Sequence, residues 1–356
     1  MRVLVTGHCG YIGDVLVRLL QQAGHEPIGV DTDLYSNCTF GSEAMADIAH
    51  TRADIRELSL ENLAGIDAVA HLAGVCNDPL GDLYPETTYD INHRATVRLA
   101  ELARAAGVRR FVFSSTCSVY GAAEDGWITE TSPPNPVTPY GRSKLQAETD
   151  MRGLATRDFT PVILRSATAY GFSPRIRFDL VLNNLVAYAF TRGTVFLKSD
   201  GLAWRPIVHI EDIARAFVAA LEADRDVVHN EIFNVGMTTE NYRVREIAAI
   251  VERVVPGSRV EHASGAGSDA RTYRVDCSKI ARVLPGFRPQ WTALRGAQQL
   301  FERYSTFGLA PEDFEGSRYQ RLACLKALIG SGAIDTSLRW QPMPRDRAAA
   351  AASAAL

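Results

Sequence analysis

The chain has 356 residues, 46% hydrophobic and 22% charged, an ordinary composition for a globular protein of two domains or of one large domain with an added lobe. The net charge of −3 argues against a nucleic-acid partner, and the six scattered cysteines suggest neither a disulfide framework nor a metal site. Because no signal-peptide pattern precedes the first strand and no apolar stretch is long enough to span a bilayer, we expect a cytoplasmic protein with reduced thiols and no membrane partner.

The chain opens with a strand that leads into a glycine-rich turn. Residues 3–5 are apolar without interruption, as in a strand covered on both faces of a parallel sheet. Gly7, Gly10 and Gly13 follow at spacings of three, ahead of an apolar helical pattern over residues 15–23. In this context the glycines predict a dinucleotide site, in which they permit a tight turn, the approach of a pyrophosphate and close helix packing. The alternative is a glycine turn without a ligand.

The second predicted strand, residues 27–30, ends at Asp31. An acidic residue about twenty positions beyond the glycines is where such sites hold a ribose hydroxyl. Thr32 and Asp33 follow, so a 2′-phosphate would meet carboxylate and no arginine, and the sequence favours NAD over NADP. The alternative is that Asp31 is a solvated loop acid.

Strands and helices then alternate along the chain, which predicts a doubly wound parallel α/β sheet with helices on both faces. Ala73 and Gly74 follow one of these strands and would let a ligand lie against the backbone. Residues 342–356 lack apolar periodicity and predict a disordered tail. The further expected strands are 66–72, 111–113, 162–164, 195–197, 205–209 and 232–234. The expected helices are 84–106, a helix from Pro139, 178–191, 211–223, 243–254, 278–284, 292–307 and 317–328, with loops at 35–50 and 165–177.

A tyrosine and a lysine stand where the chemistry of this sheet is expected. Thr138 caps the helix that begins at Pro139, and Tyr140 and Lys144 share one face of it because they are four residues apart. A neighbouring ammonium lowers the pKa of a tyrosine from about 10, so Tyr140 could accept a proton near neutral pH. Thr116, at the end of a buried strand, would bind the same substrate oxygen. The Tyr-x-x-x-Lys pair alone is a weak signal, and its weight comes from the dinucleotide turn.

With these motifs in order, the sequence resembles the extended short-chain dehydrogenase/reductases of the nucleotide-sugar epimerase/dehydratase group. The resemblance covers residues 1 to about 240 and implies a Rossmann-type fold, NAD as the cofactor, a nucleotide-sugar substrate and a homodimer. It also implies an NAD-binding domain at 1–170 to which 205–235 return, and a smaller, mostly helical substrate lobe at 171–204 and 236–341. The motifs that carry it are 6–13, 54–56, 71–74, 90–92, 114–121, 140–144 and 205–212.

The resemblance assigns roles by position. Tyr140 would be the base, Lys144 its partner and Thr116 the hydroxyl beside it. The expected cofactor contacts are Gly7, Gly10, Tyr11, Ile12 and Gly13 at the pyrophosphate, Asp31 at the ribose, Asp54 and Ile55 at the adenine, and Leu72, Ala73, Gly74 and Asn92 along the inner path, with Tyr140 and Lys144 at its end. The expected substrate contacts are Thr116, Ser118, Asn184, Arg205 and Arg271; for Arg205 and Arg271 the alternative is a surface ion pair.

The residues after Thr116 bear on the reaction. Dehydratases and decarboxylases of the group carry an acid there, whereas this chain has Cys117 and Ser118, which favours a 4-epimerase acting through a 4-keto sugar. A 4-ketoreductase, a 4,6-dehydratase or a 3,5-epimerase remain alternatives, and a non-catalytic cofactor-binding protein is disfavoured by the intact catalytic trio. We expect Cys117 to be a buried thiol that points away from the site, and His8 and His71 to be structural.

Overall fold

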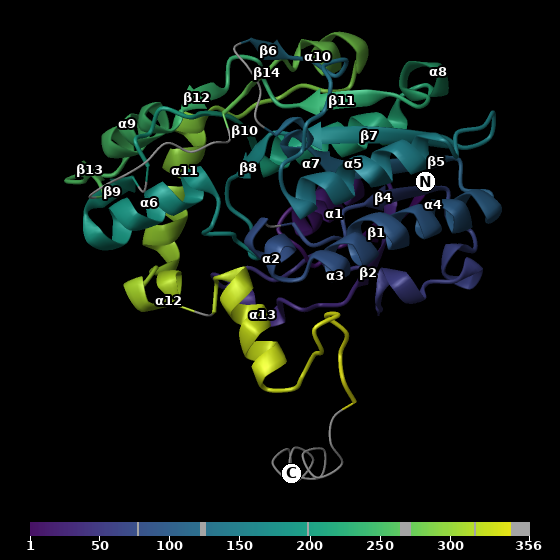
Figure 1. Ribbon diagram of the computed structural model, residues 1–356, viewed down its shortest axis with the longest axis horizontal. Helices are drawn as coiled ribbons and strands as arrows, with labels where there is room; N and C mark the ends of the chain where they lie inside the picture. The colour runs from purple at the N-terminus through teal and green to yellow at the C-terminus, as the bar shows by residue number, and fades with distance from the viewer. Residues whose placement is uncertain (77, 122–125, 198, 264–271, 317, 343–356) are drawn as a thin grey trace.

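The computed structural model describes residues 1–76, 78–121, 126–197, 199–263, 272–316 and 318–342. Its centre is a seven-stranded sheet with the order β11-β7-β5-β4-β1-β2-β3, and every pair in it is parallel (Figure 1). This order, which runs outward in both directions from β1, is that of a doubly wound Rossmann-type sheet and confirms the predicted fold class. The strands are β1 (Arg2–Thr6), β2 (Glu26–Asp31), β3 (His50–Arg52), β4 (Ala68–His71), β5 (Arg110–Thr116), β7 (Thr160–Ser166) and β11 (Ile232–Val235).

Successive strand residues point to opposite sides of this sheet, so its apolar strands give two apolar faces. Helices cover both of these faces. Val3 and Val5 of β1 belong to the core beneath α1 (Gly13–Gln22) and α7 (Ile210–Glu222). Leu4 belongs to the core on the opposite face, beneath α4 (Thr96–Ala105) and α5 (Pro139–Arg152). The central strands are therefore buried on both sides, as their uninterrupted apolar sequence predicts.

The helix expected over 84–106 is present as three consecutive segments. It comprises α3 (Pro85–Tyr89), a π-helical stretch η4 (Asp90–Ala95) and α4, after which Gly107 takes a φ of 81°. Wider π turns inside α-helices are frequent at functional sites. Here the π turn carries Asn92, one of the predicted cofactor contacts.

A second lobe lies to the left of the sheet in Figure 1 and has its own apolar core. Its elements are β8 (Thr168–Tyr170), β10 (Trp204–His209) and β12 (Asn241–Arg243) in one sheet, the pair β9 (Thr194–Leu197) and β13 (Arg259–His262), and the helices α6 (Val181–Arg192), α9 (Val244–Val254) and α11 (Ala293–Phe307). The strand β8 lies in the stretch 165–177, where we expected only a loop; its three residues are too few to produce a periodic pattern.

The stretch 35–50 is largely irregular, as expected, and one of its side chains reaches the second lobe. Phe40 is buried in the core of the second lobe, where its ring meets five aromatic rings at centroid distances of 5.7–6.5 Å. This one side chain therefore fastens the loop after β2 to the second lobe. The rings are those of Phe172, Phe178, Tyr304, Phe307 and Tyr319.

The helix predicted at 317–328 corresponds to α13 (Arg321–Gly330), which begins four residues later and ends two residues later. The remaining elements are short. Among the described residues no helix is both long and apolar enough to cross a membrane. Of the predicted tail at 342–356, residues 343–356 lie outside the described residues. The short elements are η1 (Ser36–Cys38), η2 (Ile55–Glu57), η3 (Leu60–Leu63), α2 (Asp78–Leu83), η5 (Cys117–Tyr120), β6 (Trp127–Ile128), α8 (Arg225–Val228), β14 (Arg274–Val275), α10 (Ser278–Val283) and α12 (Pro311–Glu315).

Candidate active site

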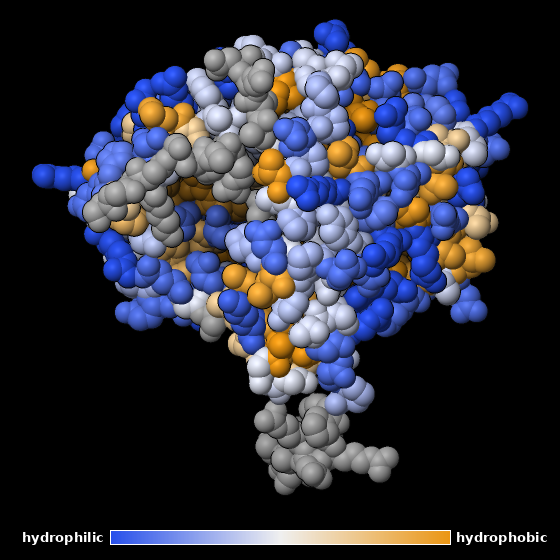
Figure 2. Space-filling model, in the orientation of Figure 1, coloured by the Kyte–Doolittle hydropathy of each residue, from blue (hydrophilic) through white to orange (hydrophobic). Residues whose placement is uncertain are grey.

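A cavity of about 700 Å³ opens at the carboxyl ends of the central strands and extends into the second lobe. Figure 2 shows a hollow in this face with apolar residues in its depth. The volume lies in the range of sites for drug-sized ligands and cofactors. Among the predicted site residues, those that line it are Gly7, Gly10, Tyr11, Ile12, Gly13, Asp31, Asp54, Ile55, Leu72, Ala73, Gly74, Thr116, Ser118, Tyr140, Lys144, Asn184 and Arg205.

The glycines after β1 let backbone segments approach one another more closely than a residue with a side chain would allow. Gly7 has a φ of 79°, and a Cβ there would lie 2.7 Å from the backbone nitrogen of Ala73. A Cβ at Gly13 would lie 2.7 Å from the Cα of His8, so the start of α1 could not approach the turn as closely. The amide of Gly10 donates to the carbonyl of Gly7 at 3.0 Å and closes the turn. This bare backbone at a helix N-terminus fits the pyrophosphate of a dinucleotide.

Tyr11 of the turn also ties the two lobes together. Its hydroxyl donates to the carbonyl of Gly171 at 2.7 Å and accepts from the side chain of Asn183 at 2.9 Å. Asn183 in turn accepts from the amide of Gly171 at 3.0 Å. Sequence reasoning missed Asn183, because no local pattern marks a partner that lies so far along the chain.

The adenosine end of the cavity carries the predicted acids. The Asp31 carboxylate accepts from the amides of Cys9 and Asp33, at 3.0 and 2.8 Å, and so shapes the turn that it would share with a ribose. Burial would raise the pKa of Asp54, but hydrogen bonds from the side chain and amide of Arg56 outweigh it and hold that pKa below its ordinary value. The Asp54 carboxylate is thus ionised and already bound to Arg56, with its shorter contact at 2.6 Å.

His8, Cys9 and Asp31 bring possible metal-ligand atoms within 4.8 Å of one another. Burial, reinforced by the charge of Asp31, raises the pKa of the Cys9 thiol to about 12. Burial also lowers the pKa of His8. Our expectation that the protein holds no metal stays a prediction.

The loop after β4, which carries the predicted contacts Ala73 and Gly74, is held by hydrogen bonds from Asn92. Asn92 is buried, and its amide accepts from the N–H of Val75 at 2.7 Å and donates to the carbonyl of Val75 at 2.9 Å and to Ser143 at 3.2 Å. A Cβ at Gly74 would lie 2.9 Å from the Asn92 carboxamide oxygen. Asn92 thereby fixes the loop after β4 against α5; its direct contact with the cofactor stays a prediction.

The predicted catalytic pair, Tyr140 and Lys144, lies on the first turns of α5. Thr138 caps this helix by accepting from the amide of Gly141 at 3.2 Å, as the sequence predicts. The Lys144 ammonium donates to the carbonyl of Ser114 at 2.9 Å and lies 4.6 Å from the centre of the Phe113 ring. Burial lowers the pKa of Lys144. The cation is therefore fixed at the end of β5, one helical turn from Tyr140.

The hydroxyl and thiol groups after β5 divide between the cavity and the core. Thr116 accepts from the amide of Ser118 at 3.1 Å, and a hydroxyl that accepts one bond can still donate its own hydrogen. Cys117 is 1% exposed, donates to the carbonyl of Arg165 at 3.3 Å, and has a pKa raised well above its ordinary value by burial. This confirms that Cys117 is a buried thiol that points away from the site.

His71 also has the structural role expected of it. Its ring is buried between the hydroxyls of Thr6 and Thr96, at 2.6 and 2.8 Å, and burial lowers its pKa to about 3. It is therefore neutral at any ordinary pH. This histidine links the end of β4 to β1 and α4.

A buried ionic network that involves β5, β7 and α5 was not predicted. Arg165 of β7 makes a two-pronged ion pair with Glu148 of α5, at 2.6 Å for the shorter contact, and both side chains are about 5% exposed or less. Ser115 of β5 donates to the same carboxylate, and Tyr120 accepts from Arg165 at 3.0 Å. The network joins the helix that carries Tyr140 to β5 and β7.

The predicted substrate contacts that the structure describes in the second lobe are Asn184 of α6 and Arg205 of β10. Asn184 donates to the carbonyl of Phe178 at 2.8 Å, and Arg205 donates to the carbonyl of Trp204 at 2.9 Å. Arg177, also at the cavity, makes a two-pronged ion pair with Asp179. The remaining predicted contact, Arg271, lies outside the described residues.

The acids that line the described part of the cavity are unevenly placed. Asp31, Asp33 and Asp54 follow β2 and β3, while Asp179 precedes α6, where Arg177 holds its pKa below the ordinary value against the effect of burial. Beside the Tyr140 phenol the lining therefore offers hydroxyls, small residues and a lysine.

Fold and cavity together define a dinucleotide-dependent enzyme of the doubly wound α/β class. More specifically, residues 3–236 match the NAD dependent epimerase/dehydratase family, and the chain belongs to this family. This confirms the predicted group and NAD as its cofactor.

Relatives in this family include both epimerases and a dehydratase. The chain is 31% identical to a UDP-glucose 4-epimerase from Corynebacterium glutamicum over 83% of this chain and 93% of the relative. It resembles the structure of MoeE5 in complex with UDP-glucuronic acid and NAD, with a TM-score of 0.73, 30% identity and coverage of 86% and 99% of the two chains. It also resembles DesIV, a dTDP-glucose 4,6-dehydratase from Streptomyces venezuelae with NAD bound, with a TM-score of 0.74, 28% identity and coverage of 86% and 97%.

Proposed function

We propose that the protein is an NAD-dependent nucleotide-sugar 4-epimerase. The observation that carries this proposal is the lining of the cavity around Tyr140. It offers the phenol of Tyr140, the ammonium of Lys144 and hydroxyls that include those of Thr116 and Ser118. Apart from Asp31, Asp33 and Asp54, the one acid of the described lining is Asp179, which is already paired with Arg177. A dehydratase or 3,5-epimerase needs a further acid or base to move a second proton, whereas a 4-epimerase does not.

The residues divide the work as follows. Tyr140 takes the proton of the sugar 4-hydroxyl while Thr116 donates a hydrogen bond to the same oxygen, and the charge of Lys144 stabilises the phenolate. Bound NAD would supply the acceptor and donor of the C4 hydride. The 4-keto sugar would turn in the cavity to present the opposite face of C4, and Tyr140 would give back the proton. Net oxidation is zero.

The cofactor is held by backbone and by acids of this chain. The turn at Gly7, Gly10 and Gly13 would hold the pyrophosphate, and Asp31 would bind the ribose hydroxyls. Ser118, Asn184 and Arg205 would bind the nucleotide sugar. We also propose a homodimer through the face that α4 and α5 share.

Incubation of the purified protein with UDP-glucose, UDP-glucuronic acid and dTDP-glucose, followed by NMR of the products, tests the proposal. We expect a 4-epimer from at least one of them without consumption of added NADH. Tyr140→Phe is expected to lower turnover by about 10²–10⁴-fold and to keep its bound NAD. Release of water with a keto-deoxy sugar, or stoichiometric oxidation of NADH, would replace the epimerase by the dehydratase or reductase alternative.

A further inference from the structure

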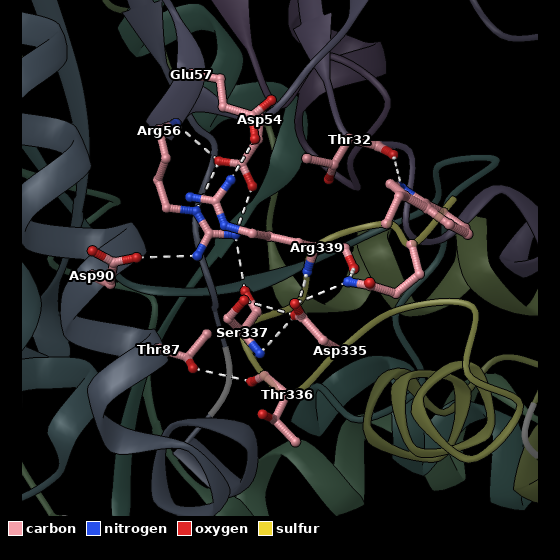
Figure 3. A network of polar contacts seen from close by, with 12 residues as sticks. Thr32, Asp54, Arg56, Glu57, Thr87, Asp90, Asp335, Thr336, Ser337 and Arg339 are labelled. Carbon is pink, nitrogen blue, oxygen red and sulfur yellow. Dashed lines mark hydrogen bonds and ion pairs between the residues drawn. The ribbon is translucent and has the colours of Figure 1, made fainter. Parts of the chain in front are cut away.

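The chain beyond α13 returns to the nucleotide-binding half of the molecule. Residues 334–341, here called the C-terminal strap, lie beside η2 and the loop after β2 (Figure 3). They are outside the residues 3–236 that match the family. The relation to the family therefore assigns no role to the strap.

The strap is a folded turn with its own hydrogen bonds. Asp335 accepts through one carboxylate oxygen from the amides of Ser337 and Arg339, at 2.9 and 3.0 Å. Its other oxygen accepts from the side chain of Gln341 at 3.0 Å. Ile334 and Trp340 form an antiparallel bridge across the turn. These contacts close residues 334–341 into a single turn.

Three segments of the nucleotide-binding half hold the strap (Figure 3). Arg56, the residue that also binds Asp54, donates to the carbonyl of Ser337 at 2.9 Å. The indole of Trp340 donates to the carbonyl of Thr32 at 2.7 Å. The other contacts are Thr87 to the carbonyl of Thr336 at 3.1 Å, the Arg52 guanidinium 4.5 Å from the centre of the Trp340 ring, and an ion pair of Arg339 with Glu57.

Leu338 connects the strap to the cofactor cavity. It is 3% exposed, packs with Val75 and Leu325, and lines the cavity together with Thr32 and Ile55. Its φ of 60° is unfavourable for a branched side chain. Strained backbone of this kind persists where surrounding contacts hold it and is concentrated at functional sites.

We propose that the C-terminal strap is the outer wall of the adenosine compartment and that NAD leaves only when the strap undocks. The strap contacts Arg56, whose guanidinium holds the Asp54 carboxylate at the predicted adenine position, and Leu338 closes the cavity next to it. The proposal rests on NAD binding and is independent of which sugar is converted. A retained cofactor suits an enzyme that must return the same hydrogen to its substrate.

The dissociation rate of NADH from the full-length protein, followed by its fluorescence after mixing with excess NAD, tests this proposal. Trp340→Ala removes one hydrogen bond and one cation–π contact of the strap, and we expect NADH to dissociate about tenfold faster. Thr87→Val removes a single hydroxyl at the surface and is expected to speed dissociation about fivefold.

Trp127→Ala is the matched control. Trp127 is 48% exposed and lies under Arg274 at 5.0 Å, much as Trp340 is 37% exposed and lies under Arg52, but Trp127 belongs to β6 and not to the strap. We expect the dissociation rate of this variant to equal that of the unmodified protein. Equal rates in all of the variants, Thr87→Val included, would overturn the proposal whatever the activity on sugars.

Discussion

The buried pair of Glu148 and Arg165 offers a prediction about how α5, the helix that carries Tyr140, is held. Glu148→Ala leaves the Arg165 guanidinium in the core with Tyr120 as a remaining partner, and it removes the acceptor of Ser115. Because both ionic side chains are about 5% exposed or less, breaking this pair should cost about 3–5 kcal/mol of the free energy of unfolding. Since Glu148 and Tyr140 share α5, turnover should fall as well.

Equilibrium unfolding in urea measures the loss, and an exposed pair provides the control. Glu86→Ala breaks the pair with Arg94, whose side chains are 85% and 58% exposed, and should cost less than about 1 kcal/mol. The double variant Glu148→Leu with Arg165→Met should recover much of the loss, because no charge then remains buried. If Glu148→Ala proves as mild as Glu86→Ala, the network does not hold α5 and the reasoning is wrong.

Three further predictions concern the turn, a histidine and the ribose site. Gly7→Ala and Gly24→Ala both place alanine at a positive φ, but only the Cβ added at position 7 would meet the Ala73 backbone. In calorimetric titrations Gly7→Ala should therefore abolish NAD binding, whereas Gly24→Ala should retain it. Burial lowers the pKa of His71 to about 3, so below pH 6.5 the unfolded chain binds more protons than the folded protein. The free energy of unfolding should therefore fall by about 2 kcal/mol between pH 7 and pH 5. Urea unfolding at the two pH values should show a smaller loss for His71→Asn than for the unmodified protein. Asp31→Ala should weaken NAD binding at least about tenfold in titrations, because a charged hydrogen-bond acceptor is lost, and a native preference for NADP would contradict the cofactor assignment.

Local patterns predicted the parts of the site that depend on local geometry. The glycine turn, the cap at Thr138 and the four-residue spacing of Tyr140 and Lys144 are written within short windows of sequence. Parallel strands then bring their carboxyl ends to one edge of the sheet, so Thr116 could be placed beside the same cavity. Buried strands were recognisable because their apolar runs are continuous.

Contacts between distant segments could not be predicted in the same way. Phe40 lies in a polar stretch that looks like a loop, and its five aromatic neighbours come from other parts of the chain. Arg165 and Glu148 are ordinary charged residues until folding buries them together. The contact of Trp340 with Thr32 spans 308 positions. No periodic pattern or spacing rule marks such pairs, since their energy comes from burial that exists only in the folded protein.

The most direct test of the central claim is isotopic. The protein is incubated in D₂O with a nucleotide sugar that it converts, and the product is examined by mass spectrometry and NMR. A 4-epimerase that relies on Tyr140 alone for proton transfer exchanges only the hydroxyl proton, so the product should carry no solvent deuterium on carbon. Deuterium at C3, C5 or C6 would show that a second carbon-bound proton is moved, and would contradict the account.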